Sequence, residues 1–97
     1  MSKHKTEQAV VYRIYTEDKG NNNVIEKIVC KQFYGGFTVI YTDGVFKGEK
    51  ENSLIVEIIG KVDDKHKVLT IAGDIKNKNN QESVLVTTAT VSINEIN

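Results

Sequence analysis

The chain has 97 residues, of which 39% are hydrophobic and 27% are charged, so it has room for one hydrophobic core and no second domain. Thirteen Lys and Arg residues balance thirteen Asp and Glu residues, and a chain without net charge is not drawn to phosphate backbones or anionic membranes. We therefore expect a single domain over residues 1–97, with short polar tails at 1–7 and 94–97, that binds neither nucleic acid nor membrane.

The cysteine content and the N-terminal residues indicate where the protein works. Cys30 is the sole cysteine of the chain, so no internal disulfide can form, which fits a reducing compartment. The polar residues 1–5 are not followed by the apolar run of a signal peptide. We expect a cytoplasmic protein.

The first half of the chain predicts a strand, a helix and a second strand. β-Branched and aromatic residues over 10–16 are typical of a strand that turns Val10, Tyr12 and Ile14 toward a core. An amphipathic helix follows Asn23 and ends at Gly35-Gly36. Its apolar stripe consists of Val24, Ile25, Ile28, Val29 and Phe33. Residues 37–42 restore strand character, and Asp43-Gly44 reads as a turn.

The second half repeats a strand, a helix and a strand. Residues 53–59 predict a strand with alternate residues Leu54, Val56 and Ile58 facing the core. A second helix follows Asp63-Asp64 and ends within 76–80, and its apolar stripe consists of Val68, Leu69, Ile71, Ala72 and Ile75. A last strand covers 83–93. This order predicts an α+β ferredoxin-like βαββαβ sandwich, with a four-stranded antiparallel sheet and two helices on one face.

The sheet face away from the helices carries mixed chemistry. Its apolar residues are Val11, Tyr15, Ile55 and Ile59. Apolar surface of this kind usually meets another subunit, so we expect a homo-oligomer. Arg13 and Glu57 lie on the same face, where they could hold an anionic ligand near Tyr15 or form a cross-strand ion pair at a subunit interface. The ion pair is favoured.

Two further segments are candidate ligand sites. Gly35 and Gly36 expose bare backbone that a ligand could approach, although a helix cap is the favoured interpretation. The ribbon that contains Phe46, Lys47 and Lys50 combines an aromatic ring with two ammonium groups. It could stack a base and neutralise a phosphate, and a solvated hairpin tip explains it equally well.

No residue has the surroundings that catalysis requires. His4, His66 and Cys30 lack neighbours spaced to form a nucleophile–base pair or a metal site. We therefore predict a protein that is not an enzyme, with no catalytic residue, no metal and no cofactor.

Four stretches of the chain carry a family resemblance. They are Gly36-Phe37-Thr38-Val39, the ribbon from Tyr41 to Lys50, the strand start Glu51-Asn52-Ser53, and the segment from Glu82 to Thr87. Together with the element order, they resemble the PII and CutA class of ferredoxin-like trimers and, more loosely, short phage-encoded proteins. The resemblance implies a trimer whose inter-subunit cavities bind small anionic or nucleotide-like molecules.

These observations lead to two functional hypotheses. The first is a non-enzymatic oligomer that binds or sequesters a nucleotide-like ligand between subunits, for instance a phage protein that soaks up an immune signalling nucleotide in the host cytoplasm. The alternative is a protein-interaction module, or an inhibitor, that docks on a host protein without a small ligand.

Overall fold

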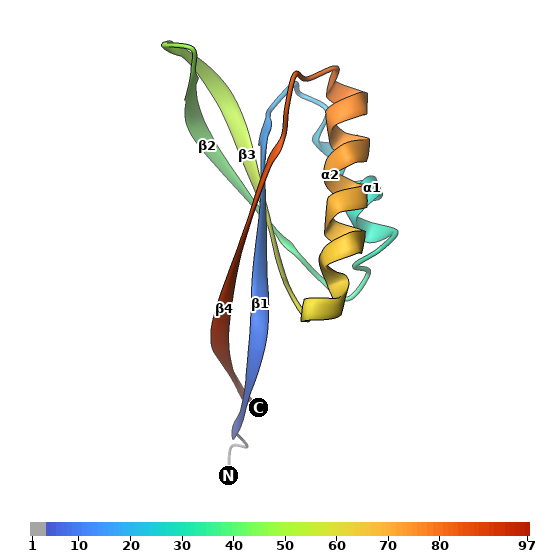
Figure 1. The fold of residues 1–97 in the computed structure, drawn as a ribbon, viewed down its shortest axis with the longest axis vertical. Coiled ribbons are helices and arrows are strands. Elements are labelled where there is room, and N and C mark those ends of the chain that lie inside the picture. The colour runs from blue at the N-terminus through green and yellow to red at the C-terminus, as the bar shows by residue number, and fades with distance from the viewer. Residues whose placement is uncertain (1–3) are drawn as a thin grey trace.

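The computed structural model describes residues 4–97, and the predicted tail residues 1–3 lie outside this range. The strands are β1 (His4–Glu17), β2 (Thr38–Phe46), β3 (Glu49–Gly60) and β4 (Leu85–Ile96). The helices are α1 (Asn22–Cys30), the short 3-10 helix η1 (Val62–Asp64) and α2 (Lys65–Asn79). The strands form one antiparallel sheet in the order β2-β3-β1-β4, and both helices lie on one face of it (Figure 1). The predicted ferredoxin-like α+β fold is confirmed.

The core lies between the helices and one face of the sheet. Alternate strand residues point to that face because successive side chains of a strand lie on opposite sides. The fully buried positions come from both layers: Tyr12, Ile14, Leu54, Val56 and Ile58 from the sheet, and Ile25, Val29, Val68, Ile71 and Ile75 from the helices. Leu69 does not join them and is 49% exposed, since its position is about 100° around the helix from Val68.

Helix α1 is shorter than the sequence predicts. It ends at Cys30, and the amides of Gln32 and Phe33 both donate to the carbonyl of Val29, at 3.0 and 2.9 Å. These bonds close a tight turn from which Phe33 packs against the core. Gly36 is not the helix cap but part of a later turn, with a φ of +143°.

The connection between β2 and β3 also differs from the prediction. Asp43 and Gly44 do not form a turn, because β2 continues through them and pairs them with Asn52 and Glu51. The chain reverses at Lys47-Gly48, whose φ angles of 52° and 81° are both positive, as a two-residue hairpin turn requires. The resulting β2–β3 hairpin starts its second strand at Glu49 rather than at residue 53.

The outer strands extend further than predicted near the chain ends. Strand β1 begins at His4, which pairs with Ile96 of β4, so residues 4–7 and 94–96 are strand rather than tail. Helix α2 ends at Asn79, within the expected range, and Asn80 follows it in the left-handed conformation. Within the described residues, no helix is long and apolar enough to cross a membrane.

We expect Tyr12→Phe to lower the free energy of unfolding by about 1 kcal/mol, because the buried Tyr12 hydroxyl donates to the Lys61 carbonyl at 2.6 Å. Burial, with smaller effects from Asp64 and Asp63, raises the pKa of Tyr12. Because the pKa of Tyr12 is higher in the folded than in the unfolded chain, the protonated hydroxyl stabilises the folded state below about pH 10. This contribution of Tyr12 is lost as the pH rises further and the hydroxyl ionises. Denaturant titrations should therefore show a gap between the parent and the variant that is largest at neutral pH and narrows above about pH 10. Equal stability at neutral pH would contradict the assignment.

Candidate functional site

A groove of about 900 Å³ lies at the end of the sheet where the β2–β3 hairpin projects beyond β1 (Figure 1). This volume lies in the range of small-molecule sites. The groove is bounded by the hairpin, the adjoining ends of the strands and the connection from α2 to β4. Its lining residues are Tyr15, Thr16, Glu17, Thr42, Asp43, Gly44, Val45, Phe46, Glu51, Ser53, Leu54, Ile55, Asn80, Gln81, Glu82, Ser83 and Leu85.

The hairpin side of the groove is shaped by the register of β2 and β3. Glu51 lies opposite Gly44 and Ser53 lies opposite Thr42, so these residues share one face of the hairpin. A Cβ atom on Gly44 would lie 3.5 Å from Cγ of Glu51 and would overlap Oγ of Ser53. The absent side chain at Gly44 therefore lets the Ser53 hydroxyl and the Glu51 side chain lie close against the backbone of β2.

The groove has an acidic lining. It includes the carboxylates Glu17, Asp43, Glu51 and Glu82, and none of its described lining residues is Lys or Arg. Lysines from outside the lining contact two of the acids: Lys19 Nζ lies 3.3 Å from Glu17, and Lys47 Nζ lies 3.3 Å from Glu82. The local field therefore favours a cationic group over an anionic one.

Asp43 and Glu51 are the acids without a partner in this lining. Across residues 4–97, neither carboxylate has a hydrogen bond or an ion pair. The two point to opposite faces of the hairpin, because they are paired with adjacent residues of the facing strand. Asp43 is exposed, whereas Glu51 is half-buried beside Gly44. Glu51 is therefore the carboxylate best placed to meet a bound cation.

Two aromatic side chains add apolar contact area to the lining. Tyr15 comes from β1 and Phe46 comes from the hairpin, where Phe46 is 47% exposed. The ammonium of Lys47 lies 5.4 Å from the centroid of the Phe46 ring. The same ammonium reaches Glu82, so it links the hairpin tip to the α2–β4 connection.

The other predicted ligand residues lie away from the groove lining. Arg13 Nε lies 3.0 Å from Glu57 Oε2 on the open sheet face, and this hydrogen bond raises the pKa of Arg13. This is the cross-strand ion pair that the sequence favoured. Lys50 lies opposite Val45 in the hairpin and is not in the lining.

The two glycines also lie elsewhere. Gly35 and Gly36 precede β2 and so lie at the opposite end of this strand from the hairpin turn. Of the predicted ligand residues, Tyr15 and Phe46 line the groove and Lys47 borders it through Glu82. A ligand role for any of them stays a prediction.

Sequence reasoning missed the acidic character of this site. The sequence marks Glu51 only as the start of a strand, and it predicts a turn at Gly44. A glycine inside a strand can mark a close approach, which is the one signal that could have pointed to the close packing of Ser53 and Glu51 against Gly44. The α2–β4 connection was also missed as part of the site, because the polar side chains of its lining residues 80–83 match no ligand-binding motif.

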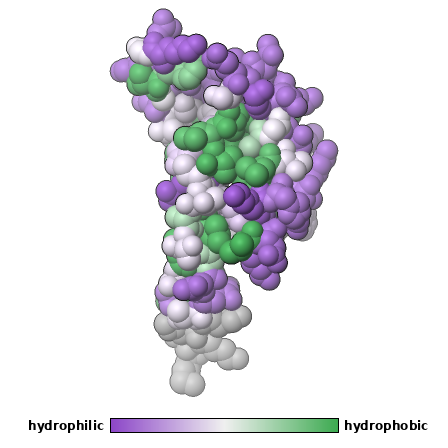
Figure 2. Space-filling view, in the orientation of Figure 1, coloured by the Kyte–Doolittle hydropathy of each residue, from purple (hydrophilic) through white to green (hydrophobic). Residues whose placement is uncertain are grey.

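One view of the surface shows where its apolar residues gather. Figure 2 shows hydrophobic residues gathered over the strands and hydrophilic residues along the helix edge. On the open sheet face, Ile59 is 53% exposed and Leu85 is 62% exposed. His66 and Cys30 are exposed as well, and no group of three or more possible metal ligands occurs within the described residues.

Comparisons with known proteins show a shared fold. Neither a protein-family model nor a curated protein matches the chain. A phage SAM lyase in its apo state is 22% identical with a TM-score of 0.67, and the match covers 91% of this chain and 90% of the lyase. The PII-like nitrogen regulatory protein CPII from Thiomonas intermedia, bound to ADP, AMP and bicarbonate, is 10% identical with a TM-score of 0.65 over 92% of this chain and 96% of CPII. A PII-like signalling protein from Thermus thermophilus is 14% identical with a TM-score of 0.61 over 92% and 91% of the two chains.

These comparisons correct one prediction and confirm another. The prediction that the chain is not an enzyme is contradicted by the phage SAM lyase, because an enzyme has this architecture at nearly the same length. That prediction assumed that catalysis needs a visible nucleophile, base or metal motif. The resemblance to PII-like and phage-encoded proteins is confirmed, and the chain has the ferredoxin-like fold that the PII-like proteins and the phage SAM lyase share.

Proposed function

We propose that the protein binds S-adenosylmethionine in the acidic groove and cleaves it as a lyase. The observation that carries the proposal is the half-buried, unpartnered carboxylate of Glu51 in a groove whose described lining has no basic residue. The likeness to a phage SAM lyase supports the same ligand. The aromatic side chains Tyr15 and Phe46 offer surfaces on which an adenine ring can stack.

Charge distinguishes this ligand from a nucleotide polyphosphate. S-adenosylmethionine has a sulfonium, an ammonium and one carboxylate, so it is a net cation at neutral pH. An acidic groove attracts such a molecule and repels a chain of phosphates. The proposed ligand is therefore a cation, whereas the sequence predicted an anionic, nucleotide-like molecule.

A lyase reaction on this substrate suits a groove without a strong base. The substrate's own carboxylate oxygen can form a bond to Cγ of the methionine part while the bond between Cγ and sulfur breaks. The bonding electron pair goes to sulfur, and the products are methylthioadenosine and homoserine lactone. No proton is transferred, so the protein only has to hold the substrate folded with these atoms close together.

Glu51 has a specific place in this scheme. The ammonium keeps its charge throughout the displacement, so a carboxylate that binds it anchors the substrate without opposing the loss of the sulfonium charge. The described lining has no Lys or Arg to pair with the substrate's carboxylate, which leaves that group free to attack. We assign Glu51 to the ammonium for these reasons.

Isothermal titration calorimetry tests the choice of ligand. We expect S-adenosylmethionine to bind more tightly than ADP or AMP, with the preference shrinking as salt is added, because salt screens the charges of the groove. S-adenosylhomocysteine, which lacks the sulfonium charge, serves as the matched comparison and should bind more weakly than S-adenosylmethionine. Tighter binding of ADP than of S-adenosylmethionine would overturn the proposal.

A second candidate function is capture of an adenine nucleotide, including the immune signalling nucleotide considered from the sequence for a phage protein in its host's cytoplasm. The ADP-bound and AMP-bound state of CPII, a protein of this fold, favours it. The same titrations distinguish the two candidates, because nucleotide capture requires ADP, AMP or a cyclic nucleotide to bind more tightly than S-adenosylmethionine.

We also propose that the protein works as a homo-oligomer, with a trimer as the favoured form, through the open sheet face. Ile59 leaves apolar surface in water there, and Leu85, which also lines the groove, does so on the other side of the Arg13–Glu57 ion pair. Burying this surface against another copy is favourable in proportion to its area.

We expect Ile59→Asp to shift the mass in solution toward the monomer, because a carboxylate in the interface would be desolvated at a cost of several kcal/mol. Multi-angle light scattering at tens of micromolar gives the mass directly. Lys27→Asp, on the exposed side of α1, is the control and should leave the mass unchanged. A parent protein that elutes as a monomer would contradict assembly through this face.

A further inference from the structure

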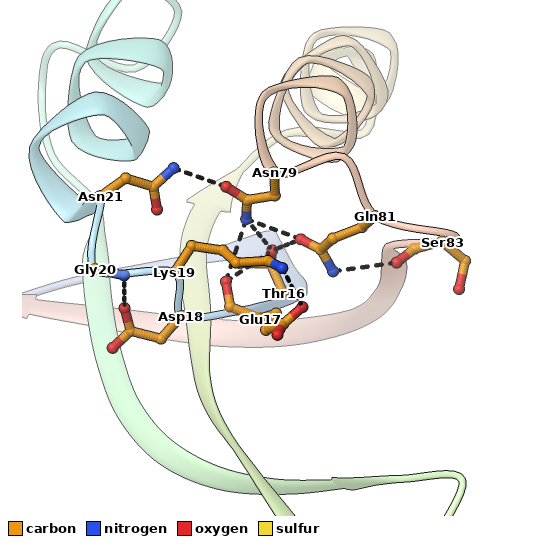
Figure 3. A network of polar contacts seen from close by, with 9 residues as sticks. All are labelled: Thr16, Glu17, Asp18, Lys19, Gly20, Asn21, Asn79, Gln81 and Ser83. Atoms are coloured by element: carbon orange, nitrogen blue, oxygen red, sulfur yellow. Dashed lines mark hydrogen bonds and ion pairs between the residues drawn. The ribbon is translucent and has the colours of Figure 1, made fainter.

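A buried polar network lies behind the groove and joins four segments of the chain (Figure 3). Its centre is Asn79, the last residue of α2, which is only 5% exposed. The Asn79 amide nitrogen donates to Thr16 Oγ1 at 3.2 Å, to the Glu17 carbonyl at 3.2 Å and to Gln81 Oε1 at 2.9 Å. One side chain therefore ties the end of α2 to the end of β1 and to the α2–β4 connection.

The network continues on both sides of Asn79. The amide nitrogen of Asn21, just before α1, donates to Asn79 Oδ1 at 2.7 Å. On the groove side, the Thr16 hydroxyl donates to Gln81 Oε1, and the Gln81 amide nitrogen donates to the Ser83 carbonyl at 3.4 Å. Asn21 and Asn79 do not line the groove, whereas Thr16 and Gln81 do.

This arrangement gives Asn79 more bonds than ending a helix requires. The backbone already ends α2, because the amides of Asn80 and Gln81 donate to the carbonyls of Asn77 and Lys76. The buried side chain instead holds two groove-lining residues, Thr16 and Gln81, at fixed positions. The buried Asn79 amide has hydrogen-bond partners for both its nitrogen and its oxygen. These bonds favour one arrangement of the groove wall that Thr16 and the α2–β4 connection form.

We infer that Asn79 is a positioning residue that sets the ligand affinity of the groove by holding the α2–β4 wall, and that Asn21 acts through it. This inference rests on the proposed function for the identity of the ligand, and on the hydrogen bonds alone for the placement of the wall. Removing either side chain loosens Gln81 and Thr16 without removing any atom that the ligand touches.

The first measurement needs no ligand and uses hydrogen exchange of backbone amides. In Asn79→Ala we expect exchange at Gln81 to rise by roughly tenfold, the size of effect that one lost buried hydrogen bond produces. Asn21→Ala, which keeps Asn79 and removes only the outer bond, should give a smaller rise at the same place. Asn77→Ala removes an exposed amide from the same helix and should change nothing. Unchanged exchange at Gln81, or an equal rise at the buried centre of α2 around Ile71, would overturn the inference.

The second measurement is calorimetric titration of the same variants with S-adenosylmethionine. A positioning role predicts that the dissociation constant rises roughly tenfold in Asn79→Ala and less in Asn21→Ala, while the number of sites per chain stays as in the parent. Fewer sites with an unchanged dissociation constant would mean that the variants only lose folded protein, and would overturn the inference. If the parent itself does not bind S-adenosylmethionine, the proposed function fails, and hydrogen exchange alone decides the role of Asn79.

Discussion

Glu51→Gln should raise the dissociation constant for S-adenosylmethionine by about one to two orders of magnitude, which corresponds to the loss of one charge-assisted contact. The change keeps the size of the side chain and removes only its charge. Because Glu51 is half-buried beside Gly44, solvent screens that charge less than it screens an exposed one. The specificity constant for cleavage should fall by a similar factor. The lost contact stabilises the bound substrate and the transition state equally, so its removal weakens the binding of both by the same free energy.

Glu49→Gln is the matched control for this experiment. Glu49 lies on the same strand and the same face as Glu51, is exposed, and is not in the groove lining. It loses the same charge at a distance of two residues, so we expect nearly parental binding. If both variants bind alike, the effect belongs to the overall charge of the hairpin and the assignment of Glu51 is wrong.

Gly44→Val should reduce affinity by roughly tenfold to a hundredfold, because its side chain would displace the Ser53 hydroxyl and push against the Glu51 side chain in the groove lining. Valine favours strands and the φ of Gly44 is not positive, so the hairpin should keep its fold. Circular dichroism and solution mass should therefore match the parent, while calorimetry records the loss.

A smaller substitution at the same position should cause a smaller loss of ligand affinity. Gly44→Ala adds only a Cβ atom, which Ser53 can accommodate by rotating its hydroxyl, so the loss of affinity should be clearly smaller than for valine. Parental affinity in both variants would show that ligand binding does not depend on the placement of Ser53 and Glu51 against Gly44.

Much of the fold could be predicted because strand alternation and helical periodicity are local signals. The alternation through Tyr12 and Ile14, and through Leu54 and Val56, identified which strand faces are buried. The same alternation placed Arg13 and Glu57 on one face, and their register in the sheet makes them neighbours. Leu69 marks the limit of this reasoning, since an apolar residue at the edge of a helical stripe can stay exposed.

The candidate site could not be predicted in the same way, because tertiary contacts form it. Asp43-Gly44 has the composition of a turn, but pairing with Glu51 and Asn52 keeps it extended, and Lys47-Gly48 takes the positive φ angles instead. Asn79 lies in the polar stretch where a helix end was expected, but nothing in that stretch signals its buried bonds to Thr16 and Gln81. The groove lining joins residues that are more than sixty positions apart, and no local pattern reports such a juxtaposition.

The most direct test of the central claim is to incubate the purified protein with S-adenosylmethionine and follow the products by liquid chromatography and mass spectrometry. We predict methylthioadenosine and homoserine lactone in equal amounts, formed over repeated turnovers and strongly reduced in Glu51→Gln when S-adenosylmethionine is well below saturation. Recovery of intact S-adenosylmethionine at the rate of a protein-free control would contradict the proposed lyase activity.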